Sequence, residues 1–147
     1  MMSKEIGILP LMVKDHCKIE KLLDEFEEST GKDHETILKA FNKFSWELEK
    51  HIFVEEKAIF TSYSPKDVVE GYAMLPELTK QHNVLLNKLN NMRRDIYRRT
   101  KPTDLYGFKE FLVGHRRFEE TNVYPKLDQN LDNESKKIIL DKINEII

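Results

Sequence analysis

Apolar residues recur at spacings of three and four along four long segments of this 147-residue chain. Such spacing lines the apolar side chains along one face of a helix, as in amphipathic helices that pack against a core. The four segments run from about Pro10 to Glu28, from about His34 to Ser62, from near Pro76 to beyond Ile96, and from near Thr103 to Pro125. Four such helices with modest connections predict an all-α fold, an antiparallel up-down-up-down four-helix bundle.

Residues that favour helix ends refine this prediction. Asp33 is suited to cap the second helix, and Pro125 is expected to stop the fourth. The chain from about Ser62 to Tyr72 is expected to be a loop with at most a short turn of helix. A short fifth helix, capped by Asn133 or Ser135, is predicted at the C-terminal end.

Composition excludes several classes of protein. A content of 39% hydrophobic and 34% charged residues is too apolar for a disordered chain. The formal net charge of −2 provides no general electrostatic attraction to nucleic acid or to an anionic membrane. The only cysteine is Cys17, which rules out an internal disulfide, and the longest apolar runs are far short of a membrane span. No signal peptide is visible, so we expect a cytoplasmic protein with neither nucleic acid nor membrane as a partner.

Polar residues interrupt each apolar face. In each of the four segments a histidine occupies one apolar slot: His16, His51, His82 and His115. Two glutamates follow the second and fourth of these histidines by four residues and therefore share their faces: Glu55 and Glu119. The histidines lie early in the first and third helices and late in the second and fourth. In an up-down-up-down bundle these positions are at the same end, and a rise of about 1.5 Å per residue aligns them to within about a turn.

The six side chains are therefore predicted to form one buried layer. Two carboxylates and four imidazoles buried without partners would cost several kcal/mol or would shift their pKa values until they became neutral. A bound cation removes this cost. The alternative is a fully satisfied hydrogen-bonded network in a metal-free helical interaction module. Six residues that agree in face, depth and pairing favour the metal.

The two halves of the chain repeat the same pattern, a lone histidine followed by H-x-x-x-E-E. The repeat predicts a pseudo-twofold arrangement in which two metals are spanned by Glu55 and Glu119. Imidazole nitrogen and carboxylate oxygen suit iron, zinc, copper or manganese, and Cys17 points about a quarter turn away from His16. Two histidines and two shared carboxylates leave positions open on a six-coordinate iron.

The chain resembles the hemerythrin-like family, in its HHE cation-binding branch, and is expected to be a single domain over residues 1–147 with the bundle at about 8–126. The resemblance rests on His16, "HIFVEE" at 51–56, "QHNVLL" at 81–86, "HRRFEE" at 115–120 and "YP" at 124–125. It implies a centre of two non-haem iron ions with an oxo or hydroxo bridge. The residues would be His16 and His51 at one iron, His82 and His115 at the other, and Glu55 and Glu119 between them.

The sequence departs from the oxygen carriers of that family. Their second histidine on the third helix is replaced here by Leu86, so the ligand set looks more like that of the bacterial proteins that repair iron centres. Their fourth-helix carboxylate would correspond to Glu120. Glu119 is preferred, because a residue at i+4 lies about 40° from the histidine and one at i+5 about 140°. Glu56 and Glu120 are expected on solvent-facing flanks, with metal coordination or support of the ligands as alternatives.

These features together predict a di-iron protein that binds or reacts with O2, NO or H2O2 at an open iron position. Its task would be sensing, storage, detoxification or iron-centre repair. The alternative is a redox-silent domain that holds iron or zinc for a structural or storage role.

Overall fold

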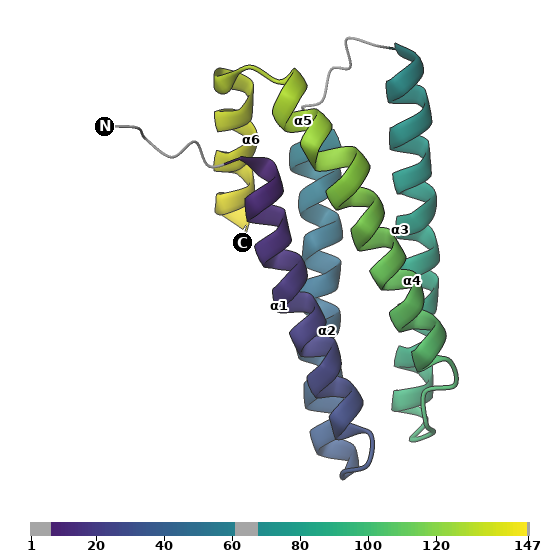
Figure 1. The fold of residues 1–147 in the computed structure, drawn as a ribbon. Helices are drawn as coiled ribbons and strands as arrows, with labels where there is room; N and C mark the ends of the chain where they lie inside the picture. The colour runs from purple at the N-terminus through teal and green to yellow at the C-terminus, as the bar shows by residue number, and fades with distance from the viewer. Residues whose placement is uncertain (1–6, 61–67, 147) are drawn as a thin grey trace.

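The computed structural model describes residues 7–60 and 68–146, and their regular structure is entirely helical. The order is α1 (Ile8–Ser29), α2 (His34–Val54), the π-helical turn η1 (Glu55–Phe60), α3 (Val68–Tyr97), α4 (Leu105–Phe118), the π-helical turn η2 (Glu119–Val123), α5 (Tyr124–Asn130) and α6 (Asn133–Ile146). Helices α1 to α4 run antiparallel as a bundle, in which η1 prolongs α2 while η2 and α5 prolong α4 (Figure 1). The prediction of an all-α four-helix bundle with a short additional C-terminal helix is confirmed.

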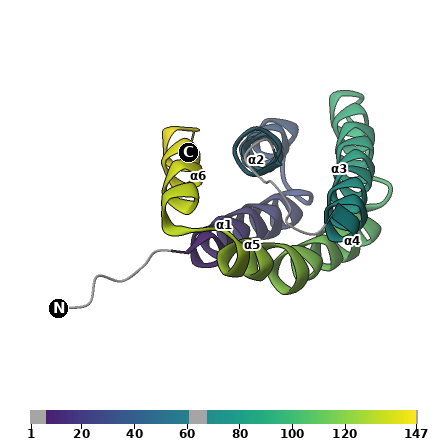
Figure 2. The same cartoon turned by 90° about the horizontal axis from the view of Figure 1, so that it is seen from above.

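The C-terminal helix α6 lies outside the four-helix bundle. Seen from above, it flanks α1 and α2 on the side opposite to α3 (Figure 2), and it packs against η1 and α2. Among the described residues, no helix combines the length and the apolar character that a membrane span requires.

Aspartate side chains cap the helices α2, α4 and α6. Oδ1 of Asp33 accepts a hydrogen bond from the backbone N–H of Thr36 at 3.0 Å, which confirms the predicted cap of α2. The cap of α4 is Asp104, which accepts from the N–H of Gly107 at 3.2 Å, so this helix begins slightly later than predicted.

The cap of α6 differs from the prediction. The backbone N–H of Ser135 donates to Oδ1 of Asp132 at 2.7 Å, so the cap is Asp132 and not Asn133 or Ser135. Asp132 also accepts the first helical bond through its own carbonyl, so the helix starts one residue after it.

Two prolines that were expected at helix ends lie inside helical segments. Pro76 lies within α3, which starts at Val68, so the predicted loop is wrong for residues 68–72, while 61–67 lie outside the described residues. A proline there removes one backbone hydrogen bond, and the buried Met74 and Leu78 on either side still pack into the core. Pro125 does not stop the helical segment that α4 begins, since η2 and α5 prolong α4 past it. Pro125 falls in the first turn of α5, where a missing N–H costs nothing.

The lower end of the bundle in Figure 1 is filled by an apolar cluster rich in phenylalanine, which we call the lower cluster. The ring of Phe26 lies 5.3 Å from that of Phe41 and 6.4 Å from that of Phe44. Phe44 in turn meets Phe108 edge to face at 5.7 Å. All four side chains are completely buried.

An upper cluster fills the other end and joins α6 to the bundle through Ile139 and Ile143. On α1, His16 lies between Met12 of the upper cluster and Ile19 of the lower one. The histidines of α3 and α4 lie between the two clusters in the same way. The polar residues therefore occupy a separate layer between two apolar ones.

Candidate metal centre

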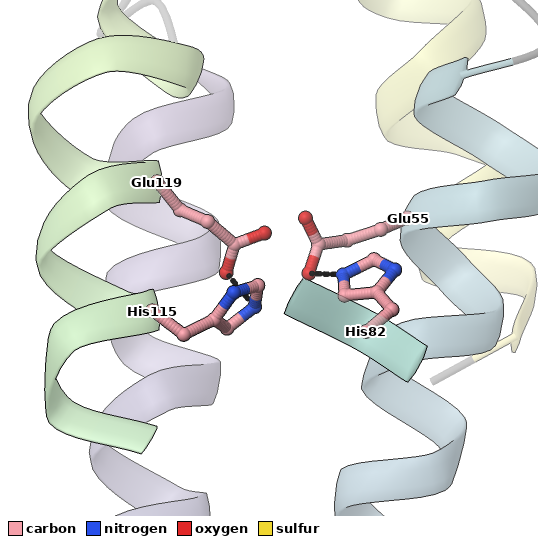
Figure 3. A group of neighbouring side chains, drawn as sticks. All are labelled: Glu55, His82, His115 and Glu119. Atoms are coloured by element: carbon pink, nitrogen blue, oxygen red, sulfur yellow. Dashed lines mark ion pairs between the residues drawn. The ribbon is translucent and has the colours of Figure 1, made fainter. Parts of the chain in front are cut away.

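The structure brings the six residues singled out by the sequence into this layer, and each is at most 5% exposed. They come from all four bundle helices and both π-helical turns: His16 (α1), His51 (α2), Glu55 (η1), His82 (α3), His115 (α4) and Glu119 (η2). Figure 3 shows four of them converging from three sides, with the two carboxylates facing each other.

The donor atoms form two groups of the kind that can hold a metal ion, and Glu119 belongs to both. One group consists of His16, His51 and Glu119, and the other of Glu55, His82, His115 and Glu119. Within each group the ligand atoms lie within 4.8 Å of one another. Glu55 also reaches the first group, since its Oε1 lies 2.7 Å from Nε2 of His51.

Glu119 is the most central of the six residues. Its Oε1 lies 3.0 Å from Nε2 of His115, 3.1 Å from Nε2 of His16 and 3.6 Å from Nε2 of His51. Glu55 lies on the opposite side, with Oε1 at 3.6 Å from Nε2 of His82 (Figure 3). Each carboxylate can thus serve both groups.

Several of these atoms are buried without a hydrogen bond in the described part of the structure. They are Oε1 and Oε2 of Glu55, Oε2 of Glu119 and Nε2 of His115. Oε1 of Glu55 lies within ion-pair distance of His51 and His82, and Nε2 of His115 lies within ion-pair distance of Glu119, but not in hydrogen-bonding geometry. Buried carboxylate oxygens without donors are costly and rare. A cation between them would satisfy all of these atoms, so the residues present fit a metal.

Both carboxylates stand at the first residue of a π-helical turn. The N–H of Tyr124 bonds to the carbonyl of Glu119, five residues back, instead of four. Such turns are uncommon and often occur at functional sites. They were not predicted, and the only sequence signal for them is that both begin at the "EE" of the repeated motif.

The far side of each imidazole contacts an acceptor from the preceding helix of the bundle. These acceptors form a closed set, which we call the outer ring: Asp15 to His51 (2.6 Å), Glu56 to His82 (3.2 Å), Gln81 to His115 (2.7 Å) and Glu120 to His16 (2.7 Å), each measured from Nδ1. An acceptor at Nδ1 fixes the ring and directs Nε2 to the centre.

The outer ring bears on one expectation and adds two residues. Glu56 and Glu120 were expected on solvent-facing flanks, with support of the ligands as an alternative. Both contact imidazoles, as in that alternative, because a residue next to a buried glutamate is turned by about 100° toward the neighbouring helix, while the Glu56 side chain is also 43% exposed. Sequence reasoning missed Asp15 and Gln81. Their signal was that each immediately precedes a histidine, at equivalent places in the two halves.

Charges in the layer move the pKa values of the buried groups. Burial alone would lower the pKa of His51, yet the charge of Glu55 and the hydrogen bond to Asp15 raise this pKa well above its ordinary value. Burial alone would raise the pKa of Glu119, but its contacts with Glu55 and His115 hold it well below the ordinary value. The raised pKa values of His51 and His82 favour protons on these two imidazoles beside the carboxylates when no cation is bound. A bound cation would replace those protons.

Tyr124 is a further polar group at the centre that sequence reasoning did not assign. Its side chain is completely buried, and its hydroxyl lies 3.5 Å from Nε2 of His16. Burial, followed by the negative charges of Glu119 and Glu55, raises the pKa of the phenol well above its ordinary value. The phenol therefore keeps its proton at neutral pH.

A small cavity adjoins the centre between α1, α2 and α4. Its walls are Ile19, Leu48 and Leu112, together with His16, His51 and His115. It offers about 10 Å³ to the centre of a water-sized sphere, which is room for a single water-sized molecule. The partly exposed ion pair of Glu20 with Arg116, at 2.7 Å, borders it on the solvent side.

Comparison with known proteins agrees with this geometry. A family model described as "Hemerythrin HHE cation binding domain" matches residues 7–127. Neither the comparison with curated proteins nor that with solved structures gave a match. The matched range contains the whole four-helix bundle and all six residues of the layer, so the chain belongs to the hemerythrin family through its HHE cation-binding domain.

Proposed function

We propose that this chain is a non-haem di-iron protein that binds a small molecule, O2, NO or peroxide, at a metal position that the protein leaves open. The observation that carries the proposal is the pair of buried ligand groups that share Glu119. Two cations held side by side by shared carboxylates are the arrangement that this geometry supports.

The donor set is compatible with iron, as it is with zinc, copper or manganese. It consists only of imidazole nitrogen and carboxylate oxygen, and the chain's one thiol, on Cys17, is exposed. With both carboxylates shared, each position has about four protein ligands, which is fewer than the six that iron accepts. Iron, when bound, would supply the electron-transfer and oxygen chemistry that side chains cannot.

The surroundings of the layer restrict what could reach it. The adjoining cavity has room for one water-sized molecule, and Ile19, Leu48 and Leu112 make much of its wall apolar. Such a cavity suits an uncharged diatomic molecule better than an organic substrate. Tyr124 holds a proton on its hydroxyl beside His16, where it can donate a hydrogen bond to a small polar ligand.

The third helix supplies one histidine to the layer. Leu86, four residues after His82, packs against the lower cluster instead. This is the position at which the sequence departs from the oxygen carriers, so we favour sensing, storage, detoxification or iron-centre repair over simple oxygen carriage. Each of these tasks begins with the same binding step.

The test is anaerobic purification, metal analysis and an optical spectrum recorded before and after exposure to air or NO. We expect two iron ions per chain and the absorption of an oxygen-bridged ferric pair that changes with these gases. A chain that carries iron but shows no response to air, NO or peroxide would contradict the proposal.

The second candidate is a redox-silent domain that holds zinc or iron. It is favoured by the group of Glu55, His82, His115 and Glu119, because four protein ligands are the number that structural zinc sites use. Zinc in stoichiometric amount, with no optical change in air, would support this candidate.

A further inference from the structure

The outer ring is not uniform. Three of its four members are carboxylates, whereas Gln81 offers a neutral amide oxygen. Asp15 and Gln81 occupy equivalent places in the two halves of the chain, each immediately before a histidine. The pseudo-twofold pattern is therefore broken at this pair of residues.

The inner ligands alone do not favour the group of His16 and His51, because among the described residues Glu55 forms a compact four-ligand group only with His82, His115 and Glu119. Oε1 of Glu55 lies near His51 and His82, at 2.7 and 3.6 Å from their Nε2 atoms. Oε1 of Glu119 lies near His16 and His115, at 3.1 and 3.0 Å. Two imidazoles and two shared carboxylates are thus available to each position, which we name the His16–His51 position and the His82–His115 position.

The outer ring distinguishes the two positions by charge. The imidazoles of the His16–His51 position are backed by two close carboxylates, Glu120 at 2.7 Å and Asp15 at 2.6 Å. Behind the His82–His115 position, the carboxylate contact found within residues 7–60 and 68–146 is that of Glu56, which is more distant at 3.2 Å and 43% exposed. A carboxylate behind an imidazole strengthens it as a metal ligand, and solvent weakens that effect.

Gln81 is held in the orientation that makes it an acceptor. Its Nε2 donates to Oε1 of Glu77 at 3.1 Å, which turns its Oε1 toward Nδ1 of His115. Glu77 thus fixes the amide without placing its own charge on the imidazole.

We propose that Gln81 makes the two positions unequal, so that a divalent cation fills the His16–His51 position first and leaves it last. Gln81 and Asp15 are positioning residues in this proposal: Gln81 acts through His115, and Asp15 acts through His51. The inference rests on the pair of metal positions in the proposed function, but not on the identity of the metal or on its chemistry.

The experiment is a zinc titration of the full chain, stripped of metal, in competition with a chromophoric chelator. The unaltered chain should bind two zinc ions in steps at least about tenfold apart. The informative variant exchanges two neighbours, Glu77→Gln together with Gln81→Glu. The exchange keeps the net charge and the hydrogen bond between positions 77 and 81, but it brings the carboxylate to His115. The weaker step should tighten by about tenfold or more, and the stronger step should stay unchanged.

A second variant acts in the opposite direction. Asp15→Asn keeps an acceptor for His51 but removes its charge, so the stronger step should weaken by about tenfold and approach the other. Asn87→Asp is the control, because it adds a charge to an exposed site of the same helix α3 away from the outer ring, and it should leave both steps unchanged.

The inference would be overturned if the two zinc ions bound with equal affinity, or if the stronger step tightened in the exchange variant. This holds regardless of how the iron-loaded chain responds to air, NO or peroxide. Unequal zinc binding combined with an iron-loaded chain that ignores air, NO and peroxide would overturn the proposed function alone. A chain that takes up no zinc would overturn both.

Discussion

The lower cluster and the histidine–carboxylate layer are equally closed to solvent, since Phe44 and Glu119 are both 0% exposed. Phe44 meets two other rings and leaves no polar group without a partner. Glu119 keeps a buried oxygen without a hydrogen bond. Burial stabilises the first region by itself, whereas in the second it creates a cost that an added cation removes.

This difference indicates that the two regions contribute to the stability of the bundle in different ways. The aromatic region should hold the four helices together whether or not metal is present. The polar layer should contribute stability only in proportion to the metal that it binds. The following substitutions and conditions test that difference, beginning with the largest expected effect.

Phe44→Ala should lower the free energy of unfolding by about 3–5 kcal/mol, because it removes a completely buried ring and leaves a cavity. The loss, measured by urea denaturation, should be the same with and without bound metal. Trp46→Ala is the matched control, since that aromatic ring is 66% exposed and its removal should cost less than about 0.5 kcal/mol. A loss at Phe44 that depends on metal would show that the two regions are not separate.

Removal of metal by a chelator should lower the free energy of unfolding by about 4 kcal/mol, compared with protein in a thousandfold excess of metal over Kd. The effect arises because the metal binds only the folded chain. Denaturation midpoints measured at several free zinc concentrations should rise with the logarithm of that concentration. A midpoint that is independent of zinc would contradict a metal site in the layer.

Glu55→Ala and Glu56→Ala separate an inner carboxylate from one of the outer ring. Glu55 is 0% exposed and faces two imidazoles, so its loss should abolish tight binding and the stability that comes with it. Loss of Glu56 should weaken metal binding by about 10–100-fold, or roughly 1.4–2.7 kcal/mol. Chelator competition and denaturation in excess zinc provide the comparison, and equal losses would refute the assignment of Glu55 between the metals.

The pH dependence of stability should change sign when metal binds. In the metal-free chain, burial is outweighed by the neighbouring carboxylates, and the pKa values of His51 and His82 are raised above the ordinary 6.5. Their contribution is complete below pH 6.5 and is lost as the pH rises through the raised values. The lowered pKa of Glu119 adds stability above its ordinary 4.5, which disappears as the pH falls through the lowered value.

The metal-free chain should therefore lose stability as the pH rises from neutral. The zinc-loaded chain should lose stability as the pH falls, because protons compete with zinc for the imidazoles. Denaturation midpoints across this pH range, with and without zinc, provide the measurement. Slopes of the same sign in both forms would be the contrary result.

Prediction from sequence succeeded where the pattern was local and repeated. The four amphipathic faces led to the bundle, and the family resemblance is confirmed. The structure also places His16 and its five companions in one layer, although their role as metal ligands stays a prediction. Prediction failed at Pro76, which was expected at a helix start, and at Pro125, which was expected to stop a helix. The local preferences of proline did not show that α3 continues through Pro76 or that α5 begins around Pro125.

The order of residues alone determined which faces of the helices are apolar and where histidine and glutamate stand on them, since helical periodicity depends only on spacing along the chain. Tertiary structure alone decided which residue supports each imidazole. Those contacts join positions between 26 and 104 residues apart, and they depend on how each helix is rotated against the one before it. The difference between Asp15 and Gln81 is visible in the sequence. Only the structure shows that each of these residues contacts a histidine of the neighbouring helix, so that the difference bears on the layer.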